Sequence, residues 1–195
     1  MPPLRPLLPS ASNPMLHEEL IKAALDCGAA KAALIRQDQI VLSASFRDIC
    51  RDGMCGQYGR CWMCPPDIGE IDELMEKIRQ YPKGILYQTI GEIEDSYDFE
   101  GMQDVSRQHE KIGIQLHKKV KPILGDSFLH LSCGGCRICP RCARLDDQPC
   151  RHPDLALPPM EGYGIDVYNT TSSTDLKYIN GANTVTYFGL ILFEE

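Results

Sequence analysis

The most constraining feature of the sequence is a run of cysteines that begins at residue 133. Cys133, Cys136, Cys139 and Cys142 are separated by two residues each, and Cys150 follows eight residues later. Three such gaps in a row suit a four-iron, four-sulfur (4Fe-4S) cluster, because one loop can wrap three corners while a more remote cysteine takes the fourth. Zinc more often takes two separated pairs of cysteines. The run therefore favours an iron–sulfur cluster, with one of the five cysteines spare, over zinc or free thiols.

A second group of cysteines lies upstream, at Cys50, Cys55, Cys61 and Cys64. Its spacing is irregular, but the glycines within it permit tight bends, and the Pro-Pro pair after Cys64 stiffens the chain. With one ligand set in each segment, the sequence predicts two 4Fe-4S clusters. A mixed zinc site, built from Cys61, Cys64 and a pair from the later run, is the open alternative.

The composition indicates a reducing environment. Ten cysteines in 195 residues are a lower density than that of small disulfide-stabilised secreted domains. No apolar run has the length of a signal peptide or a transmembrane helix, and the net charge of −7 comes without a dense basic cluster. We therefore expect a cytoplasmic protein that binds neither nucleic acid nor membranes.

Apolar periodicity and turn residues predict a flexible arm over residues 1–15 and a single domain over residues 16–195. Helices are expected over Leu16–Cys27, from a capping box at Asp67 and Glu70 to Tyr81, over Phe99–Leu124, and around Ile165–Ile179. Strands are expected over Ala32–Ile35, Ile40–Phe46, Ile85–Ile90, Phe128–Leu131 and Thr184–Phe193. The fold class is thus α/β or α+β: a single layered sheet with covering helices, and two cysteine-rich metal-binding loops that each follow a strand.

Four further residues, two histidines, one cysteine and one tryptophan, are expected to have roles other than metal ligation. His109 and His117 on the long helix are expected to be core or surface residues, and Cys27 a small apolar residue on a helix face. Trp62, within the first cysteine segment, is expected to shield a cluster from water.

Several short motifs together resemble a family of small bacterial and archaeal proteins described as predicted metal-binding proteins, with a cysteine-rich domain of unknown function. The motifs are C-x2-Y-G from Cys55, C-P-P from Cys64, G-C-x2-C-x2-C from Gly135, C-R-x-P from Cys150 and M-E-x-x-G-I-D-V from Met160. The resemblance implies metal or iron–sulfur binding in a cytoplasmic, often anaerobic setting. It also implies one complete ligand set, Cys136, Cys139, Cys142 and Cys150, with Cys133 spare. For the first segment it implies only Cys50, Cys55 and Cys64.

Three functions remain in competition, and Cys61 separates the first two. If Cys61 completes the first site, a closed pair of clusters favours electron transfer to a redox partner protein. If it does not, an open iron would let the protein act as an enzyme on a small-molecule substrate, with Tyr58, Asp67 or Glu161 as acid/base groups. The third function is a zinc-stabilised scaffold for protein interaction.

Overall fold

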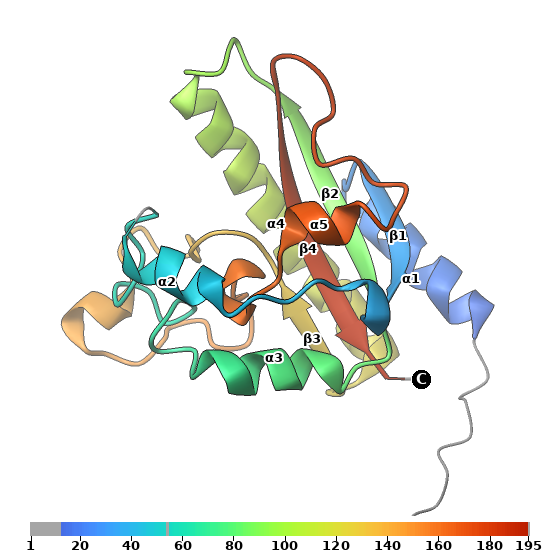
Figure 1. The fold of residues 1–195 in the computed structure, drawn as a ribbon, viewed down its shortest axis with the longest axis horizontal. Helices are drawn as coiled ribbons and strands as arrows, with labels where there is room; N and C mark the ends of the chain where they lie inside the picture. The colour runs from blue at the N-terminus through green and yellow to red at the C-terminus, as the bar shows by residue number, and fades with distance from the viewer. Residues whose placement is uncertain (1–12, 54, 195) are drawn as a thin grey trace, which may run out of the picture.

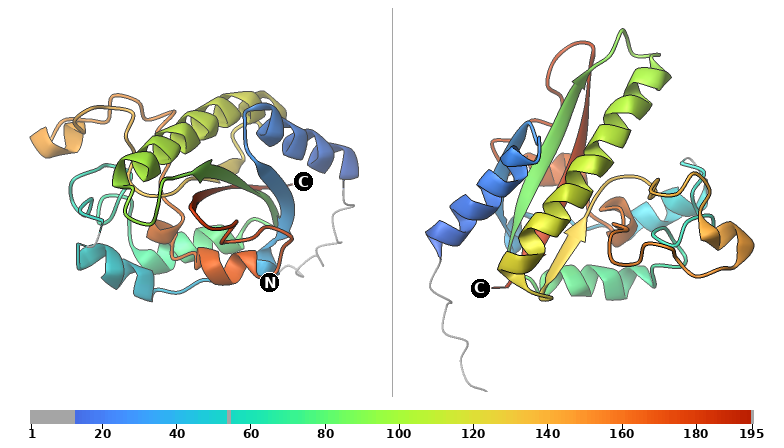
Figure 2. Two further views of the ribbon diagram at one scale, coloured as in Figure 1. Left: turned by 90° about the horizontal axis from the view of Figure 1, so that it is seen from above. Right: turned by 180° about the vertical axis from the view of Figure 1, so that it is seen from behind.

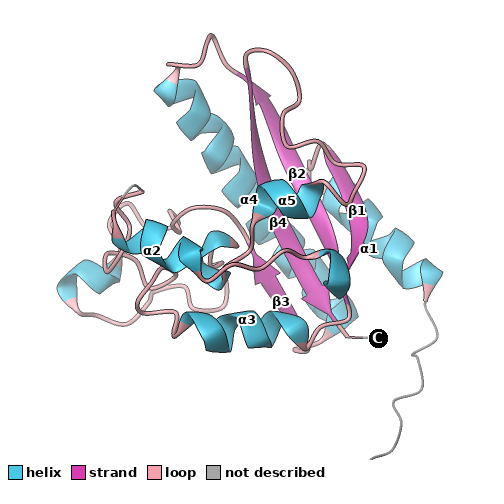
Figure 3. Ribbon diagram, in the orientation of Figure 1, coloured by secondary structure: helices cyan, strands magenta, loops and turns pink. Residues whose placement is uncertain are grey.

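A computed structural model describes residues 13–53 and 55–194 of the chain. Its centre is one four-stranded antiparallel sheet with the order β1-β2-β4-β3 (Figure 1). The strands are β1 (Lys31–Arg36), β2 (Lys83–Glu92), β3 (Phe128–Leu131) and β4 (Thr184–Phe193). The predicted layered sheet is confirmed, and all of its pairings are antiparallel (Figure 3).

Helices cover both faces of the sheet. Seen from above and from behind, α1 (Pro14–Asp26) and α4 (Phe99–Leu124) lie on one face (Figure 2). On the other face lie α3 (Ile71–Arg79) and α5 (Val167–Thr171), with α2 (Ser45–Arg51) beyond the sheet edge (Figure 1). The two faces bury two separate apolar clusters.

Strand β4 shows why the sheet needs cover on both sides. Leu190 and Leu192 face the cluster under α3 and α5, whereas Ile191 and Phe193 face the cluster under α1 and α4. Alternate residues of a strand point to opposite faces, so a continuous apolar run is buried only if both faces are covered. At the edge of this sheet, β3 leads directly into the second cysteine segment.

The long helix α4 supports that segment. It begins after Asp98, whose carboxylate accepts a hydrogen bond of 2.8 Å from the Gly101 amide, and it ends before Gly125, which has φ 67°. Its apolar stripe packs Ile112, Leu116 and Val120 against the sheet. The predicted bounds of α4, β3 and β4 are confirmed to the residue.

Four local predictions are wrong. Ile40–Phe46 is not a strand: it forms one isolated bridge, Leu42 with Ile165, and runs into α2, so the first cysteine segment begins inside a helix and not after a strand. The capping box predicted at Asp67 and Glu70 does not form, because Glu70 is the N-cap without a side-chain bond and α3 begins only at Ile71. The helix expected around Ile165–Ile179 is limited to α5. Helix α1 begins at Pro14, inside the predicted arm, and residues 1–12 of that arm lie outside the described residues.

Within the part of the chain that the structure describes, no helix combines the length and apolar character needed to cross a bilayer.

Candidate metal centre

The two cysteine segments lie side by side beyond the free edge of β3 (Figure 1). The Trp62 indole donates a hydrogen bond of 2.8 Å to the Gln148 carbonyl, and Cys61 Sγ lies 3.9 Å from the Cys136 carbonyl oxygen. Residues more than seventy positions apart are thus in contact. This proximity makes a joint site possible.

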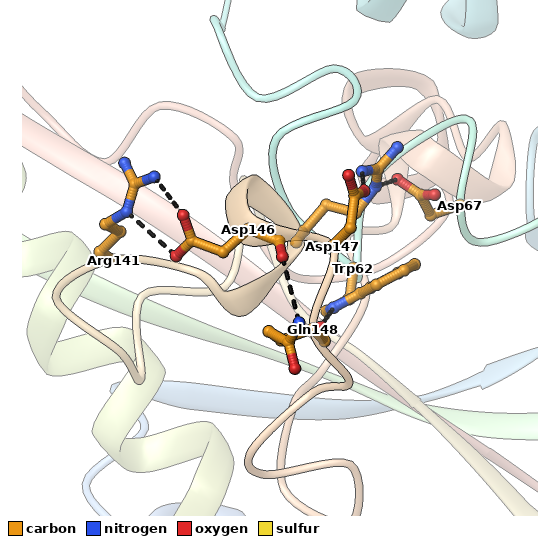
Figure 4. A network of polar contacts seen from close by, with 7 residues as sticks. Trp62, Asp67, Arg141, Asp146, Asp147 and Gln148 are labelled. Atoms are coloured by element: carbon orange, nitrogen blue, oxygen red, sulfur yellow. Dashed lines mark hydrogen bonds and ion pairs between the residues drawn. The ribbon is translucent and has the colours of Figure 1, made fainter.

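An ion pair joins the same two segments (Figure 4). Arg144 Nε lies 2.8 Å from Asp67 Oδ2, and both side chains are largely shielded from water. The Arg144 guanidinium also lies over the Trp62 ring, 5.1 Å from its centroid. Asp67 was a candidate acid/base group, but it is engaged in this ion pair with Arg144 and does not line the larger of the two cysteine-lined cavities described below.

Helix α4 fixes the start of the second segment. The Arg137 amide donates a hydrogen bond of 2.6 Å to Glu110 Oε1, and its guanidinium donates to Ser106 Oγ. Gly135 packs against the first segment so closely that a Cβ there would lie 2.8 Å from Gln57 Cγ. A side chain at this position would force the Gln57 side chain or the backbone of the second segment to shift.

Five of the cysteines line one pocket. They are Cys61, Cys136, Cys139, Cys142 and Cys150. Trp62 lines the same pocket, as its predicted shielding role requires. The free volume is about 20 Å³, close to the space that one water molecule needs. The first segment thus contributes one thiol, Cys61, to the neighbourhood of the second.

Cys61 and Cys64 are hydrogen-bonded to each other, although Cys61 lines this pocket and Cys64 lines a neighbouring, larger cavity. The Cys64 thiol donates to Cys61, and this bond, helped by the Met63 and Cys136 backbone, lowers the pKa of Cys61 against the opposing effect of burial. The same bond and burial raise the pKa of Cys64. Cys142 also bonds to Cys61, so Cys61 contacts a cysteine from each segment. A lowered pKa favours the thiolate, which is the form of cysteine that binds metals.

A second, larger cavity lies on the Cys64 side. It is lined by Cys50, Cys55 and Cys64, by Tyr58 and Glu161, and by apolar side chains including Phe46 and Ile49. Its volume is about 290 Å³, roughly that of ten water molecules in the liquid. Helix α2, which the sequence did not predict, supplies Cys50 to this cavity.

Glu161 is the one carboxylate on the cavity wall. Burial raises its pKa, while hydrogen bonds from its own amide and from the Gly134 amide act in the opposite direction. Its Oε2 atom is buried and has no hydrogen-bond partner among the described residues. The neighbouring Met160 and Ile165 are at most 1% exposed and hold this turn in the core.

Two cysteines lie away from both pockets. Cys133 points into the molecule near Phe188, and burial raises the pKa of its thiol. Cys27 packs at the edge of the cluster under α1 and α4. Neither cysteine lines the narrow pocket beside Trp62 or the larger cavity beside Glu161.

The four ligands predicted for the first segment are therefore divided between two pockets, whereas those predicted for the second line one pocket. Spacing alone did not reveal this division. Among residues 13–53 and 55–194, no three His, Cys, Asp or Glu side chains are arranged to hold a single metal ion. The donors of the larger cavity surround a space much wider than one ion.

Thiol-lined pockets of this kind, built from two cysteine-rich segments on a layered α/β scaffold, define a candidate metal-binding protein. The sequence matches the family described as "Predicted metal-binding protein (DUF2284)" over residues 33–193, and the chain belongs to this family. The family predicted from the motifs is thus confirmed, and its description supports metal binding. No curated protein and no solved structure matches the chain.

Proposed function

We propose that the protein is an iron–sulfur protein that binds two 4Fe-4S clusters and passes electrons to a partner protein. One observation carries the proposal: eight cysteines gather in two adjoining pockets, and the contact between Cys61 and Cys64 joins them. Two thiolate-bound centres in such proximity suit the movement of single electrons between them. Bound clusters would supply the one-electron chemistry, and the chain would supply thiolates and cover from water.

The donor chemistry fits iron–sulfur clusters. Cys136, Cys139, Cys142 and Cys150 would hold one cluster, while Cys50, Cys55 and Cys64 would hold the other, with Cys61 as its predicted fourth ligand. The thiol of Cys136, whose pKa burial raises to about 12, would be deprotonated by a bound metal. The pocket lined by Cys136, Cys139, Cys142 and Cys150 has a free volume of only about 20 Å³. The proposal therefore requires the irregular loop around this pocket to open when a cluster binds.

Metal analysis tests this proposal against the zinc alternative. Protein purified without oxygen should be brown and contain about eight irons and eight sulfides per chain, because two sets of four donors are available. Colourless protein with stoichiometric zinc and no sulfide would refute the iron–sulfur proposal and favour a zinc-stabilised scaffold.

A second candidate function is an enzyme with an open iron at the first centre. The observation that favours it is the cavity of about 290 Å³ beside Cys50, Cys55 and Cys64, where Cys61 is not among the lining residues. Tyr58 and Glu161 would then face a small-molecule substrate as acid/base groups. The variant Cys61→Ala separates the two functions. Loss of iron from the first centre, or unchanged iron with a paramagnetic resonance signal that small anions do not shift, supports a closed electron carrier. Unchanged iron with a signal that shifts when small anions are added supports the enzyme.

A further inference from the structure

The carboxylate of Glu161 has an unusual environment for a side chain without a defined partner. The residue as a whole is half-buried, but its Oε2 atom is buried and makes no hydrogen bond within the described residues. Two backbone amides, its own and that of Gly134, bond to the carboxylate. A buried carboxylate oxygen without a partner destabilises a folded protein, because it has lost the hydrogen bonds that it makes to water in the unfolded chain. A role that offsets this cost is therefore expected.

The surroundings of Glu161 point to a cation. The three thiols of the same cavity, Cys50, Cys55 and Cys64, carry no positive charge in any protonation state. Arg47 lies near Cys50 and donates to the Gly162 carbonyl, but no ion pair between it and Glu161 occurs among the described residues. Four potential anions around one largely apolar cavity can ionise together only if a positive charge balances them.

The local backbone holds Glu161 in this position. It begins the single turn Glu161–Tyr163, which is followed by Gly164 in the left-handed region at φ 80°. A Cβ at Gly162 would lie 2.9 Å from Ile68 Cδ1, so the turn is packed tightly against its neighbours. A group fixed in this way needs little further ordering to act as a ligand.

We propose that Glu161 is the fourth donor, through oxygen, to the metal centre held by Cys50, Cys55 and Cys64. This assignment rests on the proposed function, since it requires a metal centre in that cavity. It replaces Cys61, which contacts Cys142 and lines the pocket of the second set. Carboxylate oxygen is an established donor in mixed sites with sulfur and nitrogen, so the chemistry is ordinary. The first centre then has three sulfur donors and one oxygen donor.

Three variants of the metal-loaded protein test the assignment. Glu161→Gln keeps the size of the side chain and removes the charge, and Glu161→Asp keeps the carboxylate on a shorter side chain. Tyr58→Phe is the matched control, because it alters the wall of the same cavity without removing a carboxylate. The measurements are iron and sulfide per chain, the rate at which a chelator removes iron, and X-ray absorption at the iron edge.

We expect Glu161→Gln to release first-centre iron to the chelator at least about 10- to 100-fold faster, the range seen when supporting groups of metal ligands are lost. Its iron-edge spectrum should lose the oxygen neighbour seen in the wild type. Glu161→Asp should fall in between, and Tyr58→Phe should match the wild type. Retention of the second centre's iron in every variant shows that the fold is intact.

Two outcomes overturn the assignment alone. One is wild-type release kinetics in Glu161→Gln, and the other is an oxygen neighbour that persists in this variant and therefore comes from solvent or substrate. A wild-type protein that holds only about four irons would instead refute the two-cluster proposal itself, and the assignment with it.

Discussion

The buried histidine His109 should make stability depend on pH in a measurable way. Its ring lies on α4, 1% exposed, and stacks on Tyr87 with ring centroids 5.4 Å apart. Its Nδ1 atom is 2.8 Å from Thr89 Oγ1. Burial disfavours the charged imidazolium and lowers the pKa of His109 from 6.5 to about 4, although the Phe188 backbone opposes this in part.

The sign and size of the effect follow from proton linkage. Below pH 6.5 the unfolded chain takes up a proton at this histidine, while the folded chain does so only near pH 4. Stability is therefore fully present above pH 6.5 and is lost as the pH falls toward 4. At about 1.4 kcal/mol per pH unit, the full loss is about 3 kcal/mol, of which about 1.3 kcal/mol falls between roughly pH 7.5 and 5.5.

Urea unfolding of the wild type and of His109→Phe measures this contribution. Phenylalanine keeps an aromatic ring against Tyr87, and a second substitution, Thr89→Val, removes the hydroxyl that would be left without its partner. Between about pH 7.5 and 5.5 the wild type should lose about 1.3 kcal/mol more than the double variant, or roughly 0.5 M in urea midpoint. Because the other titrating groups are common to both proteins, the difference reports the proton binding of His109 together with its smaller electrostatic effect on the pKa of His130. Equal pH dependence in the two proteins would refute the reasoning.

Two further predictions concern the cysteine segments. Cys150→Ser should remove about one cluster's iron, whereas Cys133→Ser should keep the iron and lower the free energy of unfolding by about 1–3 kcal/mol, because a hydroxyl replaces a thiol that points into the molecule. Metal analysis and urea unfolding check both, and equal iron loss would identify Cys133 as a ligand. Asp67→Asn breaks the shielded ion pair with Arg144 and should speed the release of second-centre metal to a chelator. Asp147→Asn alters the 88%-exposed partner of the same guanidinium and should leave the release rate unchanged. Equal rates in both variants would show that the pair between Asp67 and Arg144 does not hold the segments together.

The sequence predicted the elements whose signals are long. Helix α4 has a continuous apolar stripe over 26 residues, and β4 has an apolar run that only a strand covered on both faces can bury. Short elements depended on partners that are distant in the sequence. Ile40–Phe46 alternates like a strand, but Leu42 finds only a single bridge, so the segment turns into α2. Asp67 reads as a helix cap, but Arg144 takes its carboxylate from 77 residues away.

The same limit applies to the site. The two-residue gap between Cys61 and Cys64 is typical of a chelating pair. In the structure the Cys64 amide bonds to the Cys61 carbonyl at 2.9 Å, and Cys61 lines the pocket of the second set while Cys64 lines the larger cavity. Which cavity a cysteine lines depends on the docking of the second segment, through contacts such as Trp62 with Gln148. No spacing rule within one segment contains that information.

Among the described residues, the cysteine segments form no apolar cluster of their own. Neither of the two buried clusters includes any of the eight predicted ligands. Ordering each residue of such a loop opposes folding by about 1–2 kcal/mol, more than a few contacts between the segments can offset. Binding of a structural metal contributes on the order of 10 kcal/mol in small metal-dependent domains. On the proposed function, the bound clusters would therefore stabilise this part of the molecule as an apolar core stabilises the sheet. Metal loss would then loosen the two cysteine segments. The sheet and α4 would stay folded, because they pack around apolar side chains that include none of the predicted ligands.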